Sequence, residues 1–142
     1  MSKAAQFVGV LDFHRNNPWS KEWTLDAPLG YITGRPDEEM IVAPAGFTTD
    51  GASIPWWGWL IVGPPMTGRY VEAAVIHDFL YVNHDYSRAR SDEIFLEAMK
   101  VCQVTKWKRR LMYRALRIAR KASKIYHSHD EEPQNIGGNN DD

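Results

Sequence analysis

The sequence predicts an α+β protein, with antiparallel strands in the first part of the chain and three helices in the second. Before residue 50, aromatic and β-branched residues occur in short runs between Pro, Gly and Asp, which is typical of strands. After residue 69, apolar residues recur at helical spacing. The chain has 142 residues, 44% of them hydrophobic, which suits a single core. We therefore expect an N-terminal antiparallel β-meander followed by a three-helix C-terminal half.

The strands of the meander are expected in three runs. Residues 7–13 alternate weakly, residues 23–32 are interrupted by Pro28 and Gly30, and residues 39–47 are interrupted late, by Pro44 and Gly46. These runs predict three or four strands. No two-residue hairpin turn is evident, so the sequence leaves the pairing order open.

A Gly- and Pro-rich segment over residues 48–68 is predicted as a long loop, and loops of this length are often functional. It carries three tryptophans, namely Trp56, Trp57 and Trp59. They either cover the helices as part of the core or form a surface that docks on a partner or a membrane interface.

Three helices are predicted after the loop. The first spans about residues 70–82, with an apolar stripe of Val71, Ala74, Val75 and Phe79. The second begins after Ser87 as its N-cap and ends near residue 101, with a stripe of Ile94, Phe95, Ala98 and Met99. The third follows Thr105 as its cap and ends near residue 125. The first two form a helical hairpin over residues 69–99.

Charge is distributed unevenly near the C-terminus. Residues 106–124 contain nine Lys or Arg and no acid, whereas residues 127–142 contain five acids and no Lys or Arg. We predict one domain over residues 1–126 and a disordered acidic tail over residues 127–142. The third helix is predicted to bind an anionic partner, either membrane lipid, a phage structural protein or, less favoured, nucleic acid, through Lys108, Arg109, Arg110, Arg114, Arg117, Arg120 and Lys121. The alternative is a solvated charged face.

The sequence argues against a disulfide-rich secreted protein and against a membrane-spanning protein. Cys102 is the single cysteine, so no intramolecular disulfide forms and a reducing compartment or an assembled particle is expected. The N-terminal residues lack the pattern of a signal peptide. The longest apolar run, residues 54–62, is far shorter than the roughly 20 residues of a membrane span.

The helical hairpin carries the candidate catalytic residues. His77 and Tyr81 are four residues apart and share a helix face. A short turn brings the start of the second helix near them, so Asp92, or Asp85 in the turn, is expected to approach His77. A histidine held by a carboxylate is a general base, and it suits hydrolysis of an ester or amide. The alternative is a core histidine whose carboxylate serves packing.

The same segment resembles a known active site. The string Ala-Ala-Val-Ile-His-Asp-Phe-Leu-Tyr, ending at Tyr81, and the later Asp-Glu-Ile-Phe, beginning at Asp92, look like the helix pair of prokaryotic and parvoviral phospholipases A2. The resemblance implies that His77 is the base, Asp92 orients it, Asp78 binds calcium or another divalent cation, and Tyr81 supports the network. Those enzymes have a multi-glycine calcium loop, whereas this chain has only Asp50 and the following glycine upstream of the helix. Asp50 is the candidate for a second carboxylate ligand of the cation.

A second resemblance is broader. The string Pro-Ala-Gly-Phe-Thr-Thr-Asp-Gly-Ala-Ser-Ile-Pro, from residue 44, precedes the His-Asp-x-Leu-Tyr helix and a later Ser-Arg-Ala-x-x-Asp-x-x-Phe. Together they are similar to a domain-of-unknown-function family that is common in bacteriophages and prophages. This resemblance covers roughly residues 40–120. It implies a phage-related origin, in the host cytoplasm or the virion, and brings no activity with it.

The favoured hypothesis is therefore a phage-related hydrolase with a phospholipase-A2-like His–Asp site. One alternative is a non-catalytic virion or tail component that docks partners through the Trp-rich loop and the basic helix. Another is a nucleic-acid or host-factor binding protein that acts through helix 106–125.

Overall fold

The computed structural model describes residues 4–20, 22–34, 36, 38–49, 70–83 and 85–129, with the backbone alone at 119, 120 and 122–129. Almost all of the predicted Trp-rich loop, including Trp56, Trp57 and Trp59, therefore lies outside the described residues, as does Asp50. The predicted tail lies outside them from residue 130 onward.

Over the residues that the structure describes, six short antiparallel strands make two sheets. One sheet has the order β1-β4-β5, with β1 (Gln6–Val8), β4 (Leu29–Ile32) and β5 (Met40–Ala43). The other has the order β2-β3-β6, with β2 (Phe13–Arg15), β3 (Trp23–Leu25) and β6 (Thr48–Thr49). The α+β class is confirmed. The expected meander of three or four strands needs correction, because β1 pairs with β4 and β3 with β6.

The run over residues 23–32 is divided between the two sheets at Pro28, whereas Gly30 lies inside β4. A Cβ atom on Gly30 would stand 3.2 Å from Val8 Cβ and 3.5 Å from Met40 Cε. Gly30 thus permits the close approach of β1 to β4 and does not break the strand. Next to it, Phe7 pairs with Tyr31, and their ring centroids lie 4.9 Å apart.

The helices lie where the sequence predicts them: α2 (Val71–Val82), α3 (Arg88–Val101) and α4 (Lys106–His129). Ser87 is the N-cap of α3, and its side chain accepts a 3.1 Å hydrogen bond from the backbone N–H of Arg90. α4 continues past residue 125 to His129, so the first residues of the predicted tail are helical. No Gly or Pro occurs there before Pro133 to end the helix earlier.

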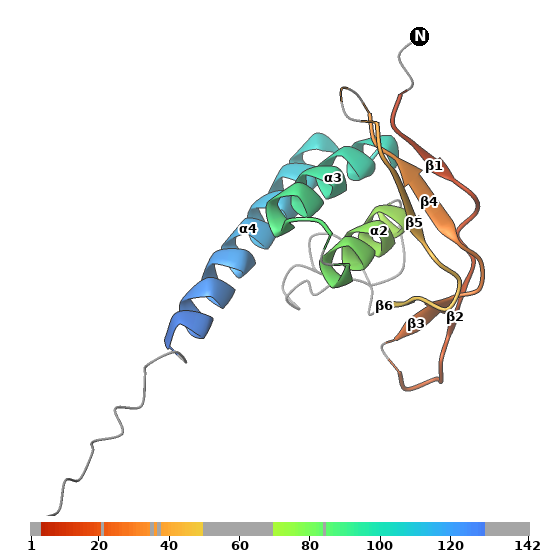
Figure 1. Cartoon of the computed structure of the whole chain (residues 1–142), viewed down its shortest axis with the longest axis horizontal. Helices are drawn as coiled ribbons and strands as arrows, with labels where there is room; N and C mark the ends of the chain where they lie inside the picture. Colours follow the sequence, from red (N-terminus) through yellow and green to blue (C-terminus); the bar gives the residue numbers. More distant parts are fainter. Residues whose placement is uncertain are drawn as a thin grey trace, which may run out of the picture.

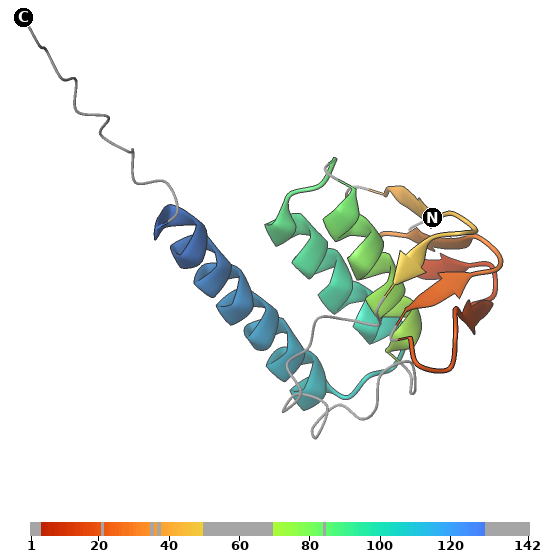
Figure 2. The ribbon, with the colours of Figure 1, turned by 90° about the horizontal axis from the view of Figure 1, so that it is seen from below.

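α2 lies at the centre of the molecule, between the strands and α3 (Figures 1 and 2). It contacts α3 on one side and β4, β5 and β6 on the other. Its buried residues therefore exceed the single predicted stripe and are Val71, Ala73, Ala74, Val75, Ile76, His77 and Leu80. Phe79, a member of the predicted stripe, is half-buried and packs edge-on against Phe47, with 5.5 Å between ring centroids.

α4 packs on α3 and extends beyond it, as both ribbon views show (Figures 1 and 2). Met112 is 4% exposed and Leu116 packs against the core, whereas Ile118, further along the helix, is 68% exposed. Contact with the body of the protein is thus made by the first part of α4. Within the described ranges, no helix has both the length and the apolar character that a membrane span requires.

Candidate functional site

His77 and Asp92 meet across the α2–α3 hairpin. His77 lies in the middle of α2 and Asp92 near the start of α3, and the short turn between the helices brings them together. His77 Nε2 lies 2.9 Å from Asp92 Oδ1. The sequence leaves open which acid approaches His77. The structure places Asp92 there, whereas Asp85 is exposed in the turn.

Tyr81 completes the cluster, as the spacing of His77 and Tyr81 predicts. Its hydroxyl donates a 2.6 Å hydrogen bond to the same Asp92 Oδ1 atom, and its ring centroid lies 4.2 Å from that of His77. Asp92 is 0% exposed, and a buried carboxylate requires donors around it. A carboxylate oxygen accepts, so both Tyr81 O–H and His77 Nε2–H serve as donors to Asp92 Oδ1.

The His77 ring is held on its faces as well as at Nε2. It is 5% exposed, and its centroid lies 4.7 Å from that of Phe95. Among the described residues, no buried side-chain nitrogen or oxygen lacks a hydrogen-bond partner. Nε2 is bound to Asp92, so Nδ1 is the ring nitrogen that this pair does not use. The contacts with Asp92, Tyr81 and Phe95 therefore hold the His77 ring in a fixed orientation.

Asp78, the next residue on α2, faces a different neighbour. Thr49 Oγ1, at the end of β6, donates a hydrogen bond to Asp78 Oδ2. Asp78 is half-buried. The residue after Thr49 is Asp50, the second predicted cation ligand, which lies outside the described residues. The described part of the chain contains no group of three His, Cys, Asp or Glu side chains arranged to hold a metal ion.

Arg88 adds positive charge at the outer side of the cluster. Its guanidinium carbon lies 5.8 Å from the centroid of the Tyr81 ring, a cation–π distance. Tyr81 is itself half-buried and so separates the exposed Arg88 from the buried Asp92. Tyr81 is thus held at both its hydroxyl and its ring.

Sequence reasoning missed two parts of this arrangement. Thr49 is 29 residues before Asp78, and no spacing rule connects a strand end to a helix at that distance. Phe95 belongs to the predicted apolar stripe of its helix, where it is indeed buried, but its contact with the His77 ring needed the packing of α2 on α3. The Thr-Thr-Asp string was the available signal for Thr49, since it ends at a predicted cation ligand.

Comparison with known proteins gives a family without an assigned activity. Residues 23–116 match the family described as "Protein of unknown function (DUF1353)". Over 73 residues, the chain is 37% identical to "Uncharacterized protein y4jT" of Sinorhizobium fredii (strain NBRC 101917 / NGR234), which covers 51% of this chain and 22% of that relative. The match thus spans less than a quarter of the relative's length. No solved structure matches the chain.

Proposed function

The chain belongs to the DUF1353 family of proteins of unknown function, and from the geometry of its hairpin site we propose that it is a hydrolase of ester or amide bonds. One observation carries the proposal: His77 Nε2 and the Tyr81 hydroxyl both bind the buried Asp92 Oδ1, at 2.9 and 2.6 Å. This arrangement leaves His77 Nδ1 as an oriented base. The phage-related origin implied by the motif resemblance is part of the same proposal.

The proposed chemistry needs one water molecule and one imidazole. His77 Nδ1 takes a proton from water as the oxygen attacks the carbonyl carbon of the substrate. Asp92 stabilises the imidazolium that forms, because its carboxylate accepts the Nε2–H hydrogen bond. The proton then passes from Nδ1 to the departing alkoxide or amine as the bond between that group and the carbonyl carbon breaks. His77 returns to its neutral form, and the products are an acid and an alcohol or amine.

Tyr81 acts in this scheme as a positioning residue. Its hydroxyl holds Asp92 Oδ1, and its ring packs beside His77, so it limits rotation of both partners. The resemblance to phospholipases A2 supports an ester in a lipid as the substrate class. It also supports a divalent cation at Asp78. Because the described residues supply no cluster of three metal ligands, we assign no chemical step to the cation.

Hydrolysis of dispersed phospholipid and of short activated esters, by the wild-type chain and by variants, tests the proposal. We expect His77→Ala to lower kcat/KM by about a hundredfold or more, the usual contribution of a general base. Asp92→Asn is expected to lower kcat because the amide favours the wrong tautomer. Tyr81→Phe is expected to change the pH profile and to lower kcat with little change in KM. Calcium and a chelator are added in parallel to measure the dependence on a divalent cation.

The chain offers a matched control for the histidine variant. His14 Nδ1 lies 2.7 Å from Asp26 Oδ1, but both side chains are exposed on the second sheet and its edge. His14→Ala removes a similar pair without touching the hairpin, so it should leave the activity unchanged. A folded His77→Ala protein that retains full activity contradicts the proposal.

The burial of the cluster also favours a second candidate, a non-catalytic virion or tail component. A buried and fully bonded polar network specifies one packing arrangement, and His77, Tyr81 and Asp92 are sufficient for such a role. This candidate predicts stoichiometric copies of the chain in purified phage particles. It also predicts that His77→Ala lowers stability without any hydrolytic activity to lose.

A further inference from the structure

Exposed Lys and Arg side chains form a line along α4, and none of them belongs to the His77, Tyr81 and Asp92 cluster. They recur every three or four residues, on one helix face, and we call them the basic stripe: Lys106, Arg110, Arg114, Arg117 and Lys121. With a rise of about 1.5 Å per residue, the stripe is about 22 Å long. Of the other predicted anion-binding residues, Lys108 and Arg109 are half-buried, and the side chain of Arg120 lies outside the described part.

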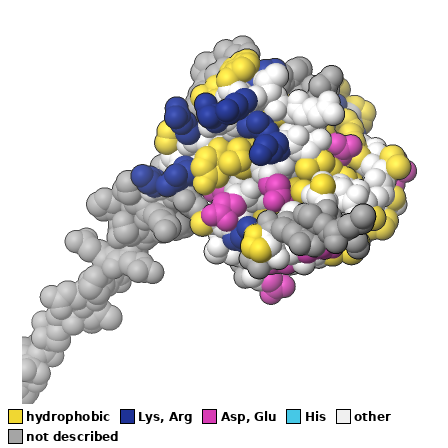
Figure 3. All heavy atoms as spheres, turned by 90° about the horizontal axis from the view of Figure 1, so that it is seen from above, with side chains coloured by type: hydrophobic (Ala, Val, Ile, Leu, Met, Phe, Trp, Pro, Cys, Tyr) yellow, Lys and Arg dark blue, Asp and Glu magenta, His cyan; other side chains and the backbone are white. Residues whose placement is uncertain are grey.

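The charge of the basic stripe is not balanced within its own helix. α4 contains no Asp or Glu from Lys106 to His129. The first turn also carries the positive end of the helix dipole. In the space-filling view, dark blue side chains gather around hydrophobic ones on the side from which α4 projects (Figure 3). A partner for this surface must therefore carry several negative charges in a row.

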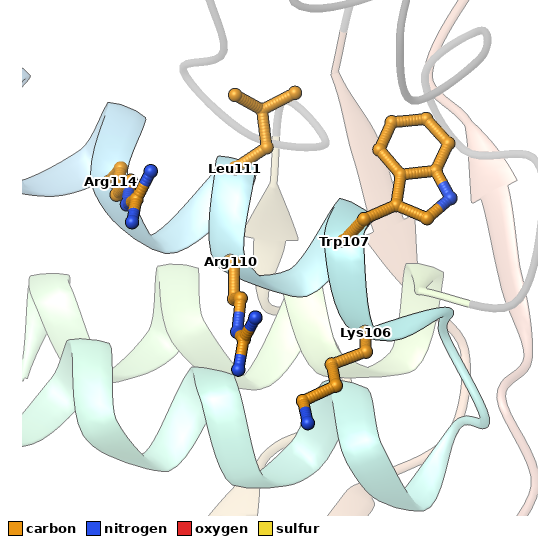
Figure 4. Close-up of a pocket in the computed structure, with 5 residues that line it drawn as sticks. All are labelled: Lys106, Trp107, Arg110, Leu111 and Arg114. Atoms are coloured by element: carbon orange, nitrogen blue, oxygen red, sulfur yellow. The ribbon is translucent and has the colours of Figure 1, made fainter.

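An aromatic side chain lies beside the start of the stripe. Lys106, Trp107, Arg110, Leu111 and Arg114 line a hollow of about 520 Å³. In the close-up, Lys106 and Arg110 point downward from α4, and Trp107 and Leu111 point upward (Figure 4). Trp107 is 58% exposed, so part of its ring is accessible to a partner. The hollow thus combines a flat ring with three cations.

The packing of α4 argues against insertion into a membrane. An amphipathic helix lies in a bilayer by burying its apolar face among the lipids. In the middle of α4 the apolar face is already used, because Met112 is buried and Leu116 packs against the protein core, whereas Ile118 is exposed. From Lys106 to Arg114, the described surface that remains is cationic, with the ring of Trp107 near its start. That combination matches proteins that bind single-stranded nucleic acid, in which cations follow the phosphates and bases stack on aromatic rings.

We propose that the basic stripe binds single-stranded nucleic acid, with Arg110 and Arg114 on the phosphate backbone and a base stacked on Trp107. Duplex binding needs only the phosphates, so an exposed ring beside the cations favours a single strand. The inference does not depend on the proposed hydrolase, because no residue of the basic stripe belongs to the His77 cluster.

Fluorescence anisotropy of a labelled oligo(dT) of about 20 nucleotides tests the inference, since a single binding module binds fewer nucleotides than that. The variant Arg110→Gln with Arg114→Gln is compared with Arg15→Gln with Lys100→Gln, which removes the same charge from exposed positions outside α4. We expect the stripe variant to bind at least tenfold more weakly than the control. The slope of log K against log salt should become shallower by about 1.4, because each phosphate that is no longer neutralised reduces the slope by about 0.7.

Trp107→Ala isolates the stacking step. We expect roughly tenfold weaker binding of the oligonucleotide with an unchanged salt slope, because the variant removes a stacking partner and no charge. Equal binding by the stripe variant and its charge-matched control overturns the inference. Unchanged binding by Trp107→Ala overturns the assignment to a single strand. Binding to vesicles that contain phosphatidylserine, together with no binding of the oligonucleotide, overturns it in favour of a membrane surface.

Discussion

Asp92 and Asp26 show how the surroundings of a residue decide what a His–Asp pair can do. Each carboxylate lies close to a histidine nitrogen, at 2.9 Å for Asp92 and 2.7 Å for Asp26. Asp26 and His14 are exposed, so water competes for their hydrogen bonds and the pair contributes little. Asp92 is fully buried and shared with Tyr81, so the orientation of His77 is fixed. Only the buried pair has the rigidity that a catalytic base requires.

The thiol of Cys102 gives a prediction at the same scale. Burial, followed by the nearby Glu72 carboxylate, raises the pKa of Cys102 from 9.0 to about 12. The neutral thiol is therefore favoured in the folded state. The buried neutral thiol contributes to the free energy of unfolding fully below the ordinary thiol pKa, and this contribution is lost as the pH rises through about 12.

Because the thiolate is the reactive form, native Cys102 should react with a thiol reagent near pH 8 roughly a thousandfold more slowly than the unfolded chain does. Cys102 is the single cysteine, so the absorbance of released thionitrobenzoate reports on this position alone. The same assay in concentrated urea is the control. Equal reaction rates for the native and the urea-unfolded protein contradict the raised pKa of Cys102.

At the scale of the element, α3 begins at Ser87 for a local reason. Its side chain accepts a hydrogen bond from Arg90 N–H, one of the backbone donors that a helix start leaves without a partner. This bond positions the first turns of α3, which carry Asp92. The same short-range chemistry explains why the start of the helix could be predicted correctly from the sequence.

The N-cap can be tested by substitution. Ser87→Ala is expected to lower the free energy of unfolding by about 1 kcal/mol, whereas Ser87→Asp, which keeps an acceptor, should lower it by far less. Urea denaturation followed by circular dichroism measures both values. An alanine variant as stable as the wild type contradicts the capping role.

At the scale of the whole molecule, Glu97 connects the first sheet to α3. Its Oε1 atom accepts hydrogen bonds from Tyr31 O–H at 2.7 Å and from Gly34 N–H at 3.1 Å. Tyr31 is fully buried, and this burial, with Glu97 beside it, raises the pKa of the Tyr31 phenol above its ordinary value. The sheet and the helical layer are thus joined by one side chain in addition to apolar packing.

Glu97→Ala leaves the buried Tyr31 hydroxyl without its acceptor. We expect it to cost about 2 kcal/mol of stability, in line with the penalty for a buried polar group that loses its partner. Glu97→Gln retains a carbonyl oxygen and should cost less. Thermal unfolding of the two variants, with Glu93→Gln as the control at an exposed position of the same helix, distinguishes them. A Glu97→Ala protein with the same midpoint of thermal unfolding as the wild type contradicts the role of Glu97 in joining the sheet to α3.

The sequence by itself determined the α+β class, the three helices, the cap at Ser87 and the meeting of α2 and α3 in a hairpin. These features depend on residues close together in the chain, because helix hydrogen bonds and caps join positions three or four apart. The proximity of His77, Tyr81 and Asp92 follows from the same short-range order, since the turn between the helices is only a few residues long.

Only the tertiary structure decided how the strands pair, which acid contacts His77, and that Thr49 binds Asp78. Gln6 pairs with Ile32 and Trp23 with Thr49, so each pairing brings together distant segments whose local patterns are alike. Short strands with weak alternation give no preference among such partners. The burial of a particular side chain depends in turn on these pairings, because the helices pack on the surface that the strands create.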